Sequence, residues 1–219
     1  MKFTLFLSAL LLGALSPVHA DSLSVRIQEA VSILDIKQGS SHPIPQNLLH
    51  NCKGVAIIRL GHGGLVFGGT HGTGIVLART KKIWGSGWSA PCAFSMSGGS
   101  FGAQIGFEKR DYIFILNTED ALKSFTSDDR LKWDATAAAT AGPDHISQEA
   151  SQVLEVPVYV YTRSDGAFAG ASLGGTSISS DQDANRAAYG DSVATSEILS
   201  GKMKSPQSAS RLYKLLEGK

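Results

Sequence analysis

Short apolar segments separated by glycines fill the middle of the chain, and this pattern constrains the fold most. The segments are residues 55–60, 65–69, 74–79, 88–96, 101–107 and 112–116. Strands this short, joined by glycine-rich turns, are typical of hairpins, because parallel strands need long crossover connections. The pattern predicts an α+β fold dominated by a mainly antiparallel, glycine-rich sheet or half-barrel.

Helical spacing appears at both ends of the chain. An amphipathic helix over residues 22–37 is predicted by apolar residues that recur every three or four positions. The residues of this stripe are Leu23, Ile27, Val31 and Leu34. Local start and stop signals predict further short helices after Pro45, over 118–125, over 181–189 and after Ser205-Pro206. The sheet therefore has an N-terminal helix and short C-terminal helices beside it.

The second half of the chain adds further strands. Residues 156–162 and 167–173 flank Ser164-Asp165-Gly166, a hairpin signal. We also expect strands at 131–141 and 176–179, and a surface loop at 142–155. Because no linker divides the chain, residues 21–219 are expected to form one domain.

The first twenty residues have the pattern of a secretory signal. Lys2 precedes an apolar run from Phe3 to Leu15, and small or helix-breaking residues lead to a cleavage site after Ala20. The alternative is an uncleaved membrane anchor, although the run is short for a spanning helix. We therefore expect a secreted or luminal protein, peripheral to a membrane where it binds one.

Charge excludes a general nucleic-acid binder. Without Lys2 the remaining chain has 19 basic and 19 acidic residues, a net charge of zero, whereas polyanion binders show a basic excess. The charge is nevertheless uneven. In residues 201–219 a single acidic residue, Glu217, accompanies five basic ones: Lys202, Lys204, Arg211, Lys214 and Lys219.

The sequence offers few groups for chemistry. Ser100 and Ser172 each lie in a G-x-S-x-G pattern, but neither segment leads into a predicted helix, as a nucleophile elbow requires. His62 and His71 lie in glycine-rich segments without a third metal ligand of suitable spacing. We therefore expect no enzyme activity, no metal and no cofactor, with a serine hydrolase as a remote alternative.

The cysteines and a tryptophan each allow two interpretations, and a set of basic residues is a candidate binding site. Cys52 and Cys92 either form a disulfide or are buried free thiols, and the sequence does not decide between them. Trp88 either anchors the protein at a membrane interface or lies in the core, and the core is favoured. Six basic residues at strand ends are candidates for anionic headgroups: Lys53, Arg79, Lys81, Lys82, Lys109 and Arg110.

Many short motifs in a fixed order resemble the SYLF domain family. They include Pro43-Ile44-Pro45, the run from Cys52 to Ile58, Trp88-Ser89-Ala90-Pro91, Phe101 to Gly106, Ala141-Gly142-Pro143, Arg163 to Leu173, Asn185 to Gly190, and Ile198 to Gly201. The similarity runs from about residue 24 to residue 217. It implies a non-enzymatic domain that binds anionic lipids or phosphoinositides, partly through its N-terminal helix, and binds actin filaments in some members.

The chain departs from the family pattern in three ways. Residues 21–37 lack the basic excess of the family's first helix, residues 80–87 lengthen a turn, and Asp144-His145-Ile146 replaces a Gly-Arg continuation. A secretory signal would also separate the domain from cytosolic actin. Lipid binding is the leading hypothesis, with an actin- or other protein-binding module as the alternative. For lipid binding, we expect Arg79, Lys81 and Lys82 to matter more than the C-terminal lysines.

Overall fold

The computed structural model describes residues 22–64, 67–80, 87–101, 106–127, 131–133, 139–143, 155–162 and 176–219. Several predictions fall outside these residues: the signal segment 1–20, the hairpin around Ser164-Asp165-Gly166, Lys81 and Lys82, and the serine Ser172. The side chain of Ser100 is likewise outside the described part.

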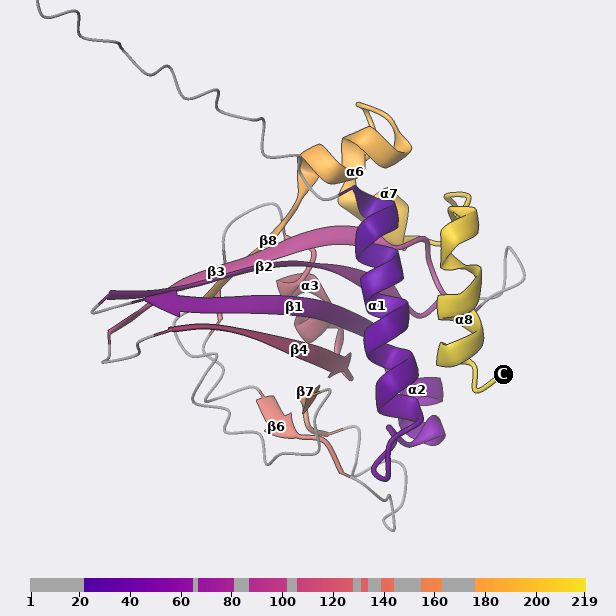
Figure 1. The fold of residues 1–219 in the computed structure, drawn as a ribbon. Coiled ribbons are helices and arrows are strands. Elements are labelled where there is room, and N and C mark those ends of the chain that lie inside the picture. Colours follow the sequence, from indigo (N-terminus) through magenta and orange to yellow (C-terminus); the bar gives the residue numbers. More distant parts are fainter. Residues whose placement is uncertain are drawn as a thin grey trace, which may run out of the picture.

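The centre of the fold is a sheet in which the described residues form eight strands, as the α+β prediction requires (Figure 1). In chain order its strands are β1 (Gly54–Gly64), β2 (Phe67–Ala78), β3 (Cys92–Phe101), β4 (Gly106–Leu116), β5 (Leu131–Trp133), β6 (Ala139–Ala141), β7 (Val158–Thr162) and β8 (Thr176–Ser180). In space the order is β5-β8-β3-β2-β1-β4-β7-β6. Every pairing is antiparallel except that of β6 with β7.

The strands are longer than the apolar runs predicted. Residues 67–69 and 74–78 of two predicted strands belong to a single strand, β2, because its glycines continue the ladder instead of turning the chain. The prediction of one strand over residues 131–141 is wrong: β5 and β6 lie at opposite edges of the sheet. Glycine occurs both inside strands and in turns, so the sequence alone does not distinguish a glycine that continues a strand from one that ends it.

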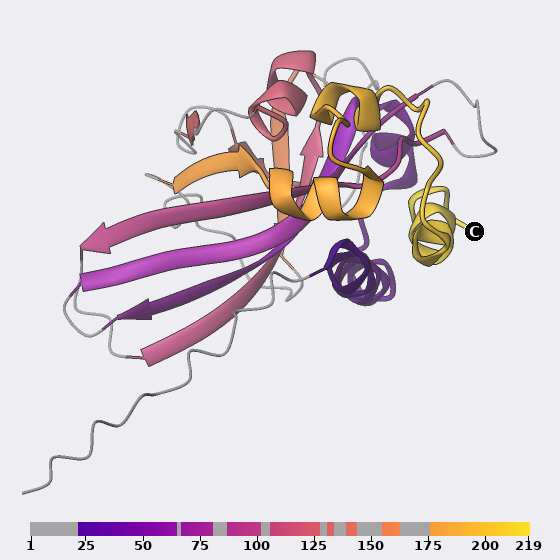
Figure 2. The same ribbon diagram turned by 90° about the horizontal axis from the view of Figure 1, so that it is seen from above.

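The helices cover the two faces of the sheet. They are α1 (Leu23–Gln38), α2 (Gln46–Asn51), α3 (Glu119–Ser124), α6 (Gln182–Tyr189), α7 (Thr195–Leu199) and α8 (Ser210–Leu216), the last preceded by a 3₁₀ turn at Gln207–Ala209. Figure 2 shows α1 and α8 on one side of the sheet and α3 on the other. Two predicted helix ends are confirmed: Thr118 accepts a hydrogen bond from the Ala121 N–H, and Gly190 ends α6. Ser205 does not cap the last helix, because the 3₁₀ turn and α8 have no side-chain cap.

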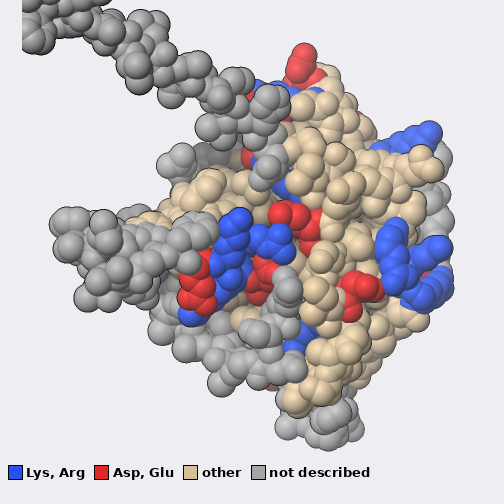
Figure 3. Space-filling view, in the orientation of Figure 1, with Lys and Arg blue, Asp and Glu red and all other residues tan. Residues whose placement is uncertain are grey.

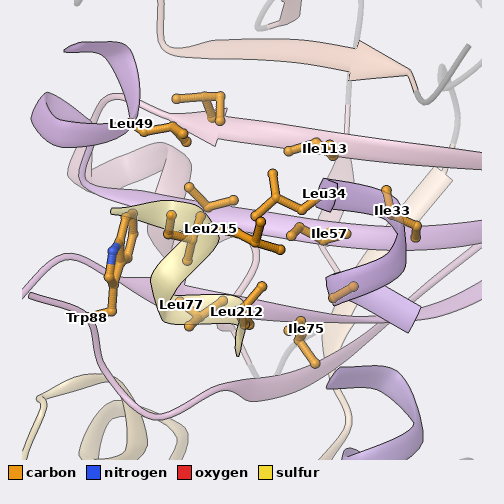
Figure 4. Close-up of a cluster of buried hydrophobic side chains, with 14 of the residues drawn as sticks. Ile33, Leu34, Leu49, Ile57, Ile75, Leu77, Trp88, Ile113, Leu212 and Leu215 are labelled. Atoms are coloured by element: carbon orange, nitrogen blue, oxygen red, sulfur yellow. The ribbon is translucent and has the colours of Figure 1, made fainter. Parts of the chain in front are cut away.

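Strand alternation divides the core into two layers. Ile57 and Ile75 point toward α1 and α8, whereas their neighbours Ile58 and Val76 point to the opposite face. Figure 4 shows the layer below α1 and α8, where Ile33, Leu34, Leu212 and Leu215 meet the sheet residues Ile57, Ile75, Leu77 and Ile113. Burying one such side chain stabilises the fold by about 1.5–3 kcal/mol, so this layer fixes both helices on the sheet.

Two glycines allow β1 and β2 to approach unusually closely. A Cβ atom at Gly72 would lie 2.2 Å from the Arg59 carbonyl oxygen, and one at Gly74 would lie 2.3 Å from the Ile57 carbonyl oxygen. Backbone atoms cannot move aside as a flexible side chain can. By contrast, a Cβ atom at Gly69 of the same strand would meet nothing within 4 Å.

We therefore expect the substitution Gly74→Ala to lower the free energy of unfolding by about 2 kcal/mol, as overpacking does in other cores. The matched control is Gly69→Ala, which should change the same quantity by less than about 1 kcal/mol because its methyl group enters open space. Urea unfolding of both variants measures the difference. Equal losses at the two positions would contradict the close approach of β1 and β2.

Candidate functional site

The apolar stripe of α1 faces the core. Leu23, Ile27 and Leu34 are 4%, 0% and 0% exposed, and Val31 packs against the same cluster. The predicted helix is therefore confirmed, and the structure places its apolar face on the sheet rather than toward solvent. Among the described residues, the exposed large hydrophobic side chains are Val25 and Ile36, both on the outer side of α1. No described helix combines the length and apolarity that a membrane crossing requires.

An ion pair between buried Arg26 and partly buried Asp181 holds the beginning of α1. Arg26 is 2% exposed, and its guanidinium donates to Asp181 Oδ2 at 2.6 Å and to the Phe94 carbonyl oxygen at 3.3 Å. Asp181 also accepts a hydrogen bond from the Ala184 N–H at the start of α6. Burial alone would raise the pKa of Asp181, but these hydrogen bonds outweigh burial and keep its pKa below the ordinary value. One carboxylate thus joins α1, β8 and α6.

A second ionic cluster joins α1 to the sheet further along. Arg59 of β1 donates to both carboxylate oxygens of Asp111 on β4, at 2.7 and 3.1 Å, and to Glu29 of α1 at 2.8 Å. The hydrogen bond to Asp111 is the main cause that raises the pKa of Arg59. Because one guanidinium faces two carboxylates, the cluster fastens α1 to the sheet and keeps one net negative charge rather than a positive one for an anionic ligand.

Arg79, predicted to meet lipid headgroups, is committed to the fold. Its guanidinium lies 3.9 Å from the centre of the Trp88 ring and donates a hydrogen bond to the Leu49 carbonyl oxygen. The side chain is half-buried, and this burial lowers the pKa of Arg79. Trp88 is 3% exposed, which confirms the core reading of that residue. Arg79 therefore ties β2 to the end of α2.

Of the other predicted cations, Lys81 and Lys82 lie outside the described residues, and the described ones do not gather into one site. Lys53 pairs with Glu119 at 3.6 Å, and Arg110 pairs with Glu108 at 2.8 Å; Lys109 is exposed beside Arg110. The register pairs Leu60 with Arg110, whereas Lys53 immediately precedes the start of β1. At about 3.3 Å per residue, these two places are separated by roughly 20 Å along the sheet. They are two small, partly neutralised groups.

A denser group of exposed cations lies over α8 and the segment leading into it. We call this group the α8 corner, and its members are Lys202, Lys204, Arg211, Lys214 and Lys219. All five side chains are exposed, and Figure 3 shows Lys and Arg atoms collected where Figure 1 places α8 and the C-terminus. The basic excess of residues 201–219 is visible in the sequence, but the sequence alone ranks these residues below Arg79 as a binding site. This ranking cannot take exposure into account, because the packing of the fold decides which side chains are exposed.

The histidines and other titratable groups do not form a metal site in the described part of the chain. His71 stands opposite Gly61 and His62 stands opposite Thr70, so the two imidazoles lie on opposite faces of the hairpin. His62 Nδ1 is 3.1 Å from Thr70 Oγ1. Among the described residues, no three His, Cys, Asp or Glu side chains come together. These glycine-rich segments lie within strands, not in the turns that the sequence favoured.

The two cysteines are free buried thiols rather than a disulfide. Cys52 belongs to the core layer below α1, and Cys92 belongs to the layer on the opposite face of the sheet. Cys92 Sγ accepts a hydrogen bond from Asn185 Nδ2 at 3.3 Å, and burial raises the pKa of Cys52 to about 12. The sequence allowed either a disulfide or two buried free thiols, and the structure shows two buried free thiols.

We expect neither cysteine of the folded protein to react with a thiol reagent at neutral pH, because both are at most 1% exposed. After unfolding in urea without a reductant, both thiols should react. A colorimetric thiol assay with and without urea measures this. Failure of the unfolded, unreduced protein to release any thiol would show a disulfide and contradict the structure.

Loss of the Asp181 carboxylate should destabilise the fold. We expect Asp181→Ala to lower the free energy of unfolding by about 3 kcal/mol at pH 7, because the buried Arg26 guanidinium loses the carboxylate that it pairs with. The folded pKa of Asp181 lies below the unfolded one, so its contribution is complete above about pH 5 and disappears as the pH falls through the folded value.

Urea unfolding at a series of pH values tests this expectation. The difference between the native protein and Asp181→Ala should narrow below about pH 4. The matched control is Asp183→Ala, in the first turn of the same helix, where the side chain is 92% exposed. A control as unstable as Asp181→Ala would mean that the loss comes from α6 in general and not from the ion pair.

Comparison with known proteins identifies relatives over most of the chain. A family model described as Ysc84, Las17-binding protein actin regulator, matches residues 97–219. LAS seventeen-binding protein 3 of Saccharomyces cerevisiae is 37% identical over 185 residues, which are 83% of this chain and 40% of that protein. Protein YSC84 of the same yeast is also 37% identical over 185 residues, covering 83% of this chain and 39% of its own length.

A human relative, SH3 domain-containing YSC84-like protein 1, is 31% identical over 183 residues, or 83% of this chain and 53% of its own length. The chain thus spans from about two fifths to about half of the length of these relatives. No solved structure gives a significant match. The resemblance read from the sequence motifs is confirmed: the chain belongs to the Ysc84 family, whose shared unit is the SYLF domain.

Proposed function

We propose that this chain is a protein-binding module of actin regulation, with a Las17-type regulator or the actin filament as its partner. The observation that carries the proposal is the extent of the similarity to LAS seventeen-binding protein 3. An aligned stretch covering 83% of the chain necessarily includes most of the sheet and its helices. The shared part is therefore the folded domain itself, and the proposal places the partner-binding property in this domain, although the aligned part is 40% of that relative.

The arrangement of charges supports a binding surface rather than a catalytic one. The ion pair of Arg26 with Asp181 and the cluster around Arg59 connect elements of the fold. Exposed charges, by contrast, collect at the α8 corner, where a partner can reach them. Complementary charges at such a surface accelerate and orient association, as they do between other proteins.

Anionic membrane lipids are the second candidate ligand. The exposed lysines of the α8 corner favour it, since each cation near an anionic bilayer contributes about 1 kcal/mol. The position of α1 weighs against the stronger form of the hypothesis, in which the helix inserts its apolar stripe. To reach a bilayer, Leu23, Ile27 and Leu34 would first have to leave the core. Each side chain would lose about 1.5–3 kcal/mol of the free energy gained by its burial.

The compartment is part of the proposal. Residues 1–20 have the pattern of a secretory signal, and we propose that they direct export and are removed after Ala20. Export separates the domain from the actin and actin regulators of its own cytosol. Its protein partner must therefore be present in a lumen or outside the cell. Mass measurement of the N-terminus of protein purified from its natural source tests this step.

We expect purified protein lacking residues 1–20 to bind purified yeast Las17 in a pull-down, or to co-sediment with actin filaments, with micromolar affinity at low salt. Binding should weaken as salt rises, because salt screens contacts with the exposed cations of the α8 corner. The control is a soluble protein of similar size and charge. Absence of binding to both Las17 and filaments, at every salt concentration, would contradict the proposal.

Flotation with vesicles separates the second candidate from the first. Under the protein-binding proposal we expect weak, salt-sensitive association with phosphatidylserine vesicles and none with phosphatidylcholine vesicles. Tight flotation that persists at high salt would show apolar insertion, and would support lipid binding instead.

A further inference from the structure

The chain's charge is segregated between its last nineteen residues and the rest. Residues 201–219 carry five basic residues and one acidic residue, a net charge of +4. Subtracting these from the chain totals of 20 basic and 19 acidic residues leaves fifteen and eighteen, a net charge of −3. The excess of positive charge therefore belongs to this segment, although the chain as a whole is almost neutral.

The fold concentrates this charge on one side of α8. Leu212, Leu215 and Leu216 pack into the core below α1, which fixes the opposite face of α8 toward solvent. Arg211 and Lys214 are one turn apart on that outer face, so their side chains are neighbours. The direction of the charged face is thus set by the apolar face behind it.

Two local contacts bring further lysines to the same place. The Lys219 N–H donates to the Lys214 carbonyl oxygen at 2.8 Å, which folds the chain end back against α8. Gly218 permits this with a φ of 71°, a left-handed conformation that suits glycine. On the other side, Tyr213 Oη and Ser205 Oγ are 2.6 Å apart, which holds the residue before Ser205, Lys204, beside α8.

Within the α8 corner only part of the charge is compensated. Arg211 pairs with Asp35 of α1 at 2.8 Å, and Lys219 pairs with Glu217 at 2.6 Å. For Lys202, Lys204 and Lys214, the described residues provide no ion-pair partner. Three exposed positive charges of residues 201–219 therefore have no ion pair to a described acidic side chain.

We propose that the α8 corner is the docking surface for an acidic segment of the partner protein; this inference rests on the proposed function. The seven residues of α8 span about 10 Å. An acidic segment of about five to seven extended residues, at roughly 3.3 Å each, covers the helix and the lysines beside it. Carboxylates match lysine ammonium groups, which act as point charges without a fixed fork geometry.

A protein partner fits this surface better than a membrane or a nucleic acid does. The exposed large apolar side chains of the described residues, Val25 and Ile36, lie on α1, so α8 presents nothing that would enter a bilayer. A nucleic acid is a long polyanion, and the net charge of −3 outside residues 201–219 would repel it beyond the corner. A short acidic segment meets only the positive surface.

The test compares two double charge reversals in the protein lacking residues 1–20. The first, Lys204→Glu with Lys214→Glu, changes the α8 corner. The matched control, Lys123→Glu with Arg186→Glu, makes the same change of net charge on α3 and α6, where both side chains are exposed. We expect the corner variant to bind Las17 or actin filaments about tenfold more weakly, and the control to stay within about twofold of the native protein. Unchanged far-ultraviolet circular dichroism confirms that both fold.

A labelled peptide of eight glutamates, followed by fluorescence anisotropy at low salt, tests the surface without the proposed partner. It should bind the native protein and the control but not the corner variant. If the native protein binds neither Las17 nor filaments, the proposed function fails, and the peptide still decides the inference. Equal binding of the peptide to both variants would overturn the inference. So would loss of phosphatidylserine-vesicle binding alone in the corner variant, which would assign the surface to a membrane.

Discussion

The packing of α1 against the sheet is the interaction on which the rest of the structure depends. A helix of sixteen residues is marginal by itself in water, and α1 has no side-chain N-cap to strengthen it. Its stability comes from Leu23, Ile27, Ile33 and Leu34, which close one face of the sheet together with α8. Without α1, Ile57 and Ile75 would face water, and α8 would lose the surface that orients its basic side.

The ionic contacts of α1 specify where it sits more than how strongly it is held. Apolar packing alone permits a helix to slide or rotate on a sheet. Arg26 reaches β3 and Asp181, and Glu29 reaches Arg59, so the helix is fixed at two points along its length. Buried pairs repay their desolvation only when the geometry is complete, which makes other positions of the helix costly.

The sequence predicted best those features that are determined within a few residues. Thr118 caps α3, and Gly190 ends α6, because capping depends on neighbours in the chain. Strand lengths were predicted poorly, because a glycine such as Gly74 breaks a local pattern whether it turns the chain or continues a ladder. The role of Arg79 was beyond local reasoning: its exposure depends on Leu49, thirty positions away, and on the ring of Trp88.

The amphipathic pattern of α1 illustrates the same limit. An apolar stripe predicts that one face will be buried, but a protein core and a bilayer satisfy the pattern equally well. The choice depends on whether the chain provides a sheet with a matching apolar face, and here β1, β2 and β4 provide it.

With the stripe in the core, the exposed large hydrophobic side chains of the described residues are Val25 and Ile36. The docking proposed for the α8 corner would then use complementary charge, which gives orientation and fast association more than tight affinity. A module of this kind is suited to brief, salt-sensitive contacts.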